Sequence, residues 1–82
     1  MDRPKLANCS LRDIQRACKK LGGCVVQKAG RHVVKVVHLQ SQKAFVIPTG
    51  VLKKGLMWDF VRSFLQDVCG YSEEQIFKVL WC

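Results

Sequence analysis

The chain has 82 residues, of which 49% are hydrophobic and 24% charged, and a formal net charge of +8. This length provides for one domain, expected over residues 1–82, and the hydrophobic content excludes a disordered chain. The apolar runs are a few residues long, whereas a membrane-spanning helix needs about 20 apolar residues. No apolar stretch that could act as a signal peptide follows the first residues. We therefore expect a cytoplasmic protein with no membrane partner.

The first predicted element is a helix over residues 10–21, where Leu11, Ile14 and Ala17 begin an apolar pattern with three- and four-residue spacing. Ser10 can cap its first turn, and Gly22 can end it. The exposed side of this helix carries several lysines and arginines.

Three short strands are predicted next. Residues 24–27 and 32–38 are rich in valine and are separated by Ala29 and Gly30, a pattern typical of a β-hairpin. Residues 44–47 form a third strand, which Pro48 closes. Short connections between successive strands favour an antiparallel sheet.

Two further helices complete the predicted fold. Over residues 56–68 apolar residues recur at positions i, i+1, i+4 and i+5, and Gly70 ends this helix. Ser72 and Gln75 form a capping-box pattern before a last short helix at about 72–81. The first helix and the long helix, both amphipathic, are expected to cover one face of the sheet. The predicted class is α+β: helix, three-stranded antiparallel sheet, helix, with a core at about 10–70 and a short extra C-terminal helix.

The charge is unevenly distributed. From Ile14 to Trp58 the chain carries nine Lys or Arg residues and both histidines but no Asp or Glu. Such a stretch has no acidic group of its own to pair with. Nucleic acid is the expected partner, because its phosphates form a dense line of negative charge that lysines and arginines neutralise with release of counterions.

The five cysteines are expected to be reduced thiols. Their number is odd, and no pair has the two-residue spacing of a zinc-binding pair. Disulfide frameworks occur mainly in exported proteins. Cys18, Cys24 and Cys69 fall within apolar patterns, where a thiol behaves as a small hydrophobic side chain. Metal binding and redox chemistry are the less favoured alternatives.

Three short motifs resemble the HicA family of bacterial toxins, RNA-cleaving members of toxin–antitoxin pairs with a fold like that of double-stranded-RNA-binding domains. They are KLGG at residues 20–23, GRH at 30–32, and VIP at 46–48 followed by LKKG at 52–55. Their order and the elements between them cover roughly residues 11–74. One departure is Leu56, which stands where the family more often carries Thr or Ser.

The resemblance implies a metal-independent endoribonuclease, or mRNA interferase, that needs no cofactor and is held inactive by a cognate antitoxin protein. The histidine after the hairpin glycine is His32, and an imidazole can take up or release a proton at neutral pH. RNA supplies its own nucleophile in the 2′-hydroxyl, so no metal is required. The expected RNA-binding residues, which would meet the phosphate charge, are Lys28, Gly30, Arg31, Lys35, Lys53 and Lys54. For Lys53 and Lys54, at the start of the long helix with Gly55 as its cap, the alternative is a solvated loop.

Other interpretations of the same residues stay open. His32 can be a polar cap on the sheet, and the fold and the basic face would serve a non-catalytic RNA-binding module equally well. His38 is expected at the surface. Trp58 can stack on a base or lie at the margin of the core, and Trp81 is assigned to packing. A membrane-active cationic peptide is disfavoured, because the chain is patterned for a core.

Overall fold

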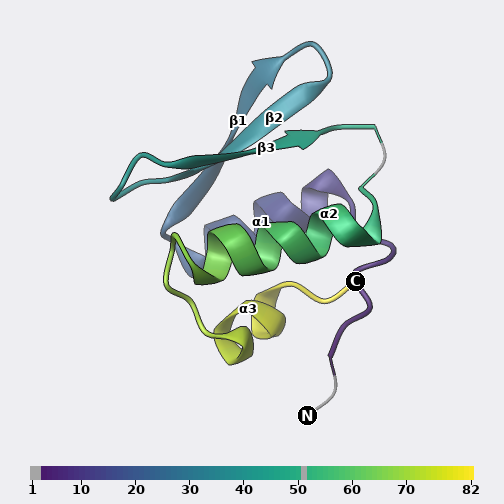
Figure 1. Cartoon of the computed structure of the whole chain (residues 1–82), viewed down its shortest axis with the longest axis vertical. Coiled ribbons are helices and arrows are strands. Elements are labelled where there is room, and N and C mark those ends of the chain that lie inside the picture. The colour runs from purple at the N-terminus through teal and green to yellow at the C-terminus, as the bar shows by residue number, and fades with distance from the viewer. Residues whose placement is uncertain (1–2, 51) are drawn as a thin grey trace.

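The computed structural model describes residues 3–50 and 52–82. The elements follow in the order α1 (Leu11–Leu21), β1 (Cys24–Gly30), β2 (Val33–His38), β3 (Ala44–Pro48), α2 (Lys54–Asp59), η1 (Phe60–Gln66) and α3 (Glu73–Val79). The predicted α+β layout is confirmed. In Figure 1 the sheet lies above α1 and α2, and α3 lies on the far side of these helices from the sheet.

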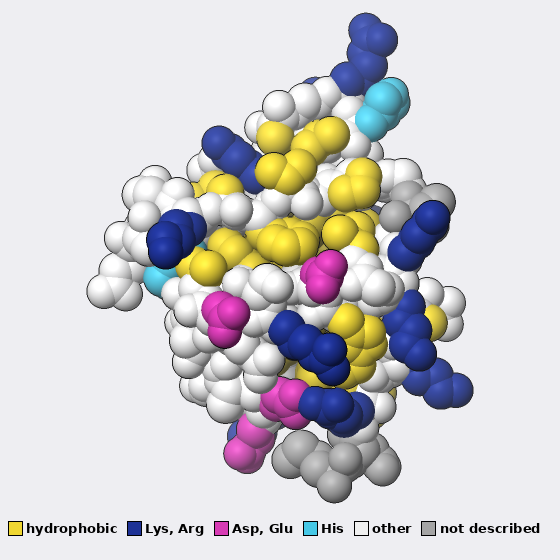
Figure 2. Space-filling view, in the orientation of Figure 1, with side chains coloured by type: hydrophobic (Ala, Val, Ile, Leu, Met, Phe, Trp, Pro, Cys, Tyr) yellow, Lys and Arg dark blue, Asp and Glu magenta, His cyan; other side chains and the backbone are white. Residues whose placement is uncertain are grey.

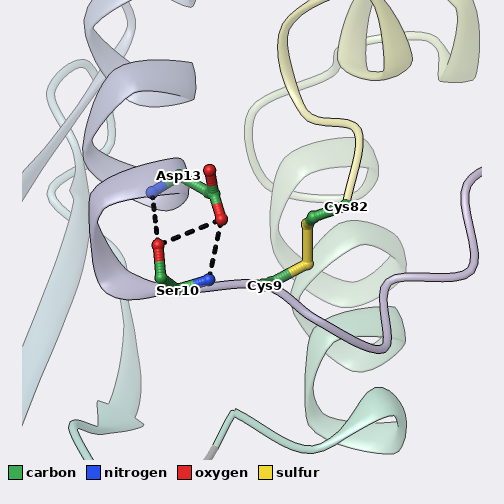
Figure 3. The surroundings of a disulfide bond; sticks show 4 residues. All are labelled: Cys9, Ser10, Asp13 and Cys82. Atoms are coloured by element: carbon green, nitrogen blue, oxygen red, sulfur yellow. Dashed lines mark hydrogen bonds between the residues drawn. A yellow bond between two sulfur atoms is a disulfide. The ribbon is translucent and has the colours of Figure 1, made fainter.

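The boundaries of α1 follow from its capping residues, as predicted. The Ser10 hydroxyl accepts a hydrogen bond from the Asp13 amide, and the Asp13 carboxylate accepts one from the Ser10 amide at 2.8 Å (Figure 3). These two bonds satisfy amides that the first turn leaves free. At the other end Gly22 has a φ of +82°, a left-handed conformation that glycine adopts without steric cost.

The sheet has the strand order β1–β2–β3, and both pairs are antiparallel. In β2, Val34 and Val36 are buried against the helices, and their partners Ile47 and Phe45 in β3 share that face. Successive side chains of a strand point to opposite faces, so Val37 and Val46 lie on the other face. No described helix covers this second face (Figure 1).

One hydrophobic core contains buried residues from every element. Its members include Leu6, Ile14, Cys24, Val36, Ile47, Leu52, Met57, Phe64, Ile76 and Leu80. The core therefore extends on both sides of the predicted interval of 10–70, into the N-terminal segment and α3. The helices of the described residues are all too short or too polar to span a lipid bilayer.

The long helix departs from the prediction because its second half is π-helical. The amides of Asp67 and Cys69 donate to the carbonyls of Arg62 and Phe64, five residues back, at 3.2 and 2.9 Å. A strict four-residue apolar repeat drifts by about 40° per step around an α-helix. The wider turns of a π-helix reduce this drift. Four apolar residues therefore stay buried in the core: Phe60, Val61, Phe64 and Leu65. The Phe60 and Phe64 rings stack 5.7 Å apart.

His38 is buried, so its prediction as a surface residue was wrong. Only 9% of the residue is exposed, and its side chain lies on the helix-facing side of β2 opposite Cys24. Its Nδ1 is 2.7 Å from the Ser41 hydroxyl, which satisfies the buried ring. The β2–β3 connection therefore folds back over the imidazole.

Two of the cysteines form a disulfide, so the expectation that all five are reduced was wrong. Cys9 is bonded to Cys82, 73 positions away, and Cys9 directly precedes the cap of α1 (Figure 3). The bridge joins the two ends of the chain, a pairing that no local spacing indicates. Cys18 and Cys24 are free and buried, as their apolar pattern predicted, and Cys69 is free and half-buried.

Replacing Cys82 with serine is expected to lower the free energy of unfolding by roughly 4 kcal/mol, because the bridge closes a loop of more than 70 residues. Denaturant unfolding of both proteins without reductant measures the difference. Cys69→Ser is the control, because it removes a thiol that takes part in no disulfide. Equal stabilities of wild type and Cys82→Ser would show that the bridge does not form in solution.

Candidate nucleic-acid interface

His32 lies in the two-residue turn between β1 and β2. The pairing of Gly30 with Val33 leaves Arg31 and His32 as the turn, and the register shifts between Lys28 and Gly30, so Ala29 forms a bulge. The His32 side chain is exposed, while its backbone carbonyl accepts a hydrogen bond from the Thr49 amide at 2.9 Å. The imidazole is thus open to solvent on a turn that the end of β3 holds in place.

The hairpin carries cations on both of its faces. Lys28 and Arg31 are exposed and Lys35 is half-buried. Lys28 pairs with Val34, whose side chain faces the helices, whereas Lys35 lies on the open face. Arg31 and His32 lie between them at the tip. No described acidic group forms an ion pair with any of these three cations.

Gly30 is not required by the shape of the backbone. A Cβ there would come no closer than 3.8 Å to its nearest neighbour, an ordinary contact, and its φ is not in the left-handed range. As a predicted RNA-binding residue it can contribute its backbone groups and the close approach that a missing side chain permits.

Lys53 and Lys54 begin α2, away from the hairpin tip (Figure 1). Lys53 is the cap residue and Lys54 the first helical residue, so the prediction of Gly55 as the cap was wrong. No side chain caps this helix, and both lysines are exposed. Among the described residues, no hydrogen bond or ion pair connects either lysine to the hairpin. The structure therefore brings together Lys28, Gly30, Arg31 and His32 but not the two lysines of α2.

The acidic residues are segregated from the sheet. Figure 2 shows Lys, Arg and His side chains over the hairpin end of the molecule, whereas the Asp and Glu side chains of this view lie over the helices, together with further Lys and Arg side chains. The described ion pairs follow the same division, since Arg3 with Glu73 and Lys78 with Glu74 both involve α3. The field at the hairpin is thus positive and uncompensated, the arrangement that attracts polyanions.

Replacing Arg31 with glutamine is expected to lower by about one the slope of log affinity for RNA against log salt concentration. The matched control is Lys43→Gln, which removes an exposed cation at the opposite end of β2. Fluorescence anisotropy of a labelled RNA at several salt concentrations gives both slopes. An unchanged slope for Arg31→Gln, or an equal loss in the control, would show that the hairpin tip is not the contact.

The free thiols form a separate cluster beneath the start of β1. Cys18 and Cys24 are hydrogen-bonded to each other, which raises the pKa of Cys18 and lowers that of Cys24. Both border a hollow of about 260 Å³ beside α1. Burial raises the pKa of Cys69, nearby, from 9.0 to about 11. No group of three His, Cys, Asp or Glu residues within 3–50 and 52–82 is arranged to hold a metal ion.

The raised pKa of Cys69 predicts a loss of stability in alkaline solution. The fold favours the protonated thiol, so this contribution is complete below pH 9, where the unfolded thiol is also protonated, and is lost as the pH rises toward 11. Denaturant unfolding of wild type and Cys69→Ala between pH 8 and 11 isolates the effect. Wild type is expected to lose more stability than the variant, and parallel pH profiles would contradict the assignment.

Comparison with known proteins identifies no relative: no family model matches the chain, and neither a curated protein nor a solved structure matches it significantly. The HicA resemblance therefore depends on the three motifs and on the layout in which they lie.

Proposed function

We propose that the chain is a metal-independent endoribonuclease of the HicA toxin type, with His32 as its proton-transferring group. The observation that supports the proposal is the exposed imidazole at the tip of a hairpin whose cations have no described acidic partner. The exposed tip can contact a phosphodiester, and Lys28 and Arg31 precede the histidine in the chain by four residues and by one residue. This combination of an exposed imidazole and positive charge without a described acidic partner suits cleavage of RNA.

In the proposed reaction the 2′-oxygen attacks the adjacent phosphorus, and the bond from phosphorus to the 5′-oxygen breaks. His32 accepts the proton of the 2′-hydroxyl, and the departing 5′-oxygen takes a proton from water. The products are a 2′,3′-cyclic phosphate and a 5′-hydroxyl. Arg31 and Lys28 stabilise the negative charge that accumulates on the phosphate oxygens.

The proposed natural partner is an antitoxin protein that covers the hairpin with acidic side chains and so hides His32. A cytoplasmic location belongs to the same proposal, because the mRNA target is there. The Cys9–Cys82 bridge is the feature that counts against this location, since disulfides persist mainly in oxidising compartments. Rapid alkylation of cell extracts followed by mass spectrometry would show whether the two thiols are free in the cell.

Incubation of the purified chain with RNA in a buffer containing a chelator tests the activity. Cleavage with cyclic phosphate ends is the expected result. Salt-sensitive binding to RNA that remains intact would reject the enzyme and leave the binding module.

One observation favours that second candidate, a non-catalytic module that binds structured RNA by shape and charge. No described side chain forms a hydrogen bond with the His32 ring, whereas a catalytic base is ordinarily oriented by a neighbouring group. For His32 to act as a catalytic base, the hydrogen bond that orients its ring must come from the substrate phosphate.

A further inference from the structure

A second group of cations and aromatic rings lies beside the Cys9–Cys82 bridge, where the described ends of the chain approach each other. This part of the chain lies away from the hairpin (Figure 1). A hollow of about 440 Å³ opens there, lined by Arg3, Pro4, Lys5, Asn8, Trp81 and Cys82. The disulfide between Cys9 and Cys82 joins its two sides. This hollow shares no residue with the hairpin site.

Trp81 is the aromatic wall of the hollow, and its assignment to packing was wrong. Its ring meets Phe77 edge to face, with centroids 6.5 Å apart, but 58% of the residue is exposed. Phe77 is itself only 7% exposed and contacts Trp58 in the same manner at 5.9 Å. A buried ring thus holds in place a tryptophan whose surface remains largely free for a ligand.

Two arginines near these aromatic rings are held by specific contacts. The guanidinium carbons of Arg3 and Arg62 lie 5.3 and 5.2 Å from the centre of the Trp58 ring, within the range of cation–π attraction. Arg3 also forms an ion pair with Glu73. Lys5, on the same wall as Arg3, is exposed and has no described acidic partner. The hollow therefore combines one fixed cation, one cation without a described acidic partner, and an exposed aromatic ring.

This combination matches the chemistry of a nucleotide. A base presents a flat face that stacks on an indole ring, and its phosphate requires cations within reach. A volume of about 440 Å³ falls in the range of small-molecule sites. An acidic peptide would use the cations but leave Trp81 without a partner. Glu73 and Glu74 on the adjacent α3 oppose an anionic lipid surface.

We propose that this hollow binds one nucleotide of single-stranded RNA, with the base stacked on Trp81 and the phosphate contacted by Arg3 and Lys5. The proposal depends on the proposed function only in taking RNA as the ligand. The described ends of the chain lie away from the hairpin (Figure 1), so this is a separate contact that would anchor a strand outside the cleavage site.

The test uses the full chain in a buffer without reductant, so that the Cys9–Cys82 bridge stays closed. The chain contains two tryptophans, and Trp58→Phe leaves Trp81 as the only fluorescent one. Titration of this variant with a tetranucleotide of uridine is expected to quench the fluorescence in a saturable manner. Because Trp81 lines the hollow, its quenching reports binding there and not at the hairpin.

Trp81→Leu in the otherwise unchanged chain is expected to weaken binding of a labelled tetranucleotide by about 5- to 150-fold, the measured range for loss of one stacked base. Lys5→Gln is expected to lower the salt slope by about one. The control is Lys78→Gln, which removes an exposed cation of α3 that does not line the hollow. Because Trp81 and Lys5 are both exposed, circular dichroism should show that Trp81→Leu and Lys5→Gln are folded.

Binding by Trp81→Leu within twofold of wild type would overturn the proposal. Equal quenching by a polyglutamate peptide or by phosphatidylserine vesicles would also overturn it. His32→Ala is expected to bind the tetranucleotide like wild type, so loss of cleavage with retained quenching would count against the hairpin only. Cleavage of long RNA by wild type together with unchanged binding in Trp81→Leu would count against the hollow only.

Discussion

Replacing His32 with alanine is expected to reduce RNA cleavage by about 100- to 10,000-fold, the usual contribution of a positioned acid or base. The physical reason is that the β1–β2 turn contains no other imidazole and no carboxylate, so the variant has no group there to accept the 2′-hydroxyl proton. Initial rates on a fluorescently labelled RNA under saturating protein measure the loss.

The same variant separates a chemical role from a structural one. His32 is exposed and only its backbone carbonyl is bonded to Thr49, so alanine keeps that bond and should change stability by no more than about 0.5 kcal/mol. RNA affinity should also persist, because Lys28 and Arg31 remain. Lys43→Gln, at the far end of β2, should cleave at the wild-type rate. Retained cleavage by His32→Ala would reject the assignment.

Replacing Phe64 with alanine is expected to lower the free energy of unfolding by about 3–5 kcal/mol, the cost of removing a buried aromatic ring and leaving a cavity. Phe64 is 1% exposed, stacks on Phe60, and lies 6.2 Å from the ring of Phe45 in β3. It therefore connects the π-helical segment to the sheet. Denaturant unfolding at constant temperature gives the difference.

The control for this prediction is Leu39→Ala, which removes a large apolar side chain that is 47% exposed in the β2–β3 connection. Its stability should stay within about 0.5 kcal/mol of wild type. Similar losses in the two variants would mean that the packing between η1 and β3 is not the main source of stability.

Local chemistry made most of the fold predictable from the sequence. Ser10 with Asp13 and Ser72 with Gln75 bond as capping boxes, and Gly22 and Gly70 adopt the left-handed conformation expected of helix ends. Each of these signals acts over three or four residues, so it can be recognised from the local sequence alone. The valine-rich strands paired in sequence order for the same reason, since short connections leave few alternatives.

The features that the sequence did not reveal depend on distant contacts. The bridge between Cys9 and Cys82 and the placement of Arg3 on Trp58 require the chain ends to meet, which no local pattern encodes. The π-helical turns of η1 keep a four-residue apolar repeat in the core, whereas the apolar spacing was interpreted as that of an ordinary α-helix. The alternation of side chains along β2 gives the face on which His38 lies, but the burial of His38 depends on the β2–β3 connection that covers it.

The candidate site was predictable in part. The sequence placed Lys28, Gly30, Arg31 and His32 on one hairpin, and the structure agrees. Lys53 and Lys54 were grouped with them by sequence motif, but their place depends on how the chain crosses from β3 to α2. The hollow beside Trp81 was missed, because its walls come from opposite ends of the chain.

The central claim, that His32 activates the RNA's own 2′-hydroxyl, is tested most directly with a pair of oligonucleotides that differ at one sugar. One is an RNA with a mapped cleavage position, and the other carries a 2′-deoxy sugar on the 5′ side of that bond. Both are incubated with the chain and a chelator, and the ends are analysed by mass spectrometry. We expect cleavage of the RNA to a cyclic phosphate and an intact bond in the deoxy substrate. Cleavage of both at similar rates would be inconsistent with attack by the 2′-oxygen.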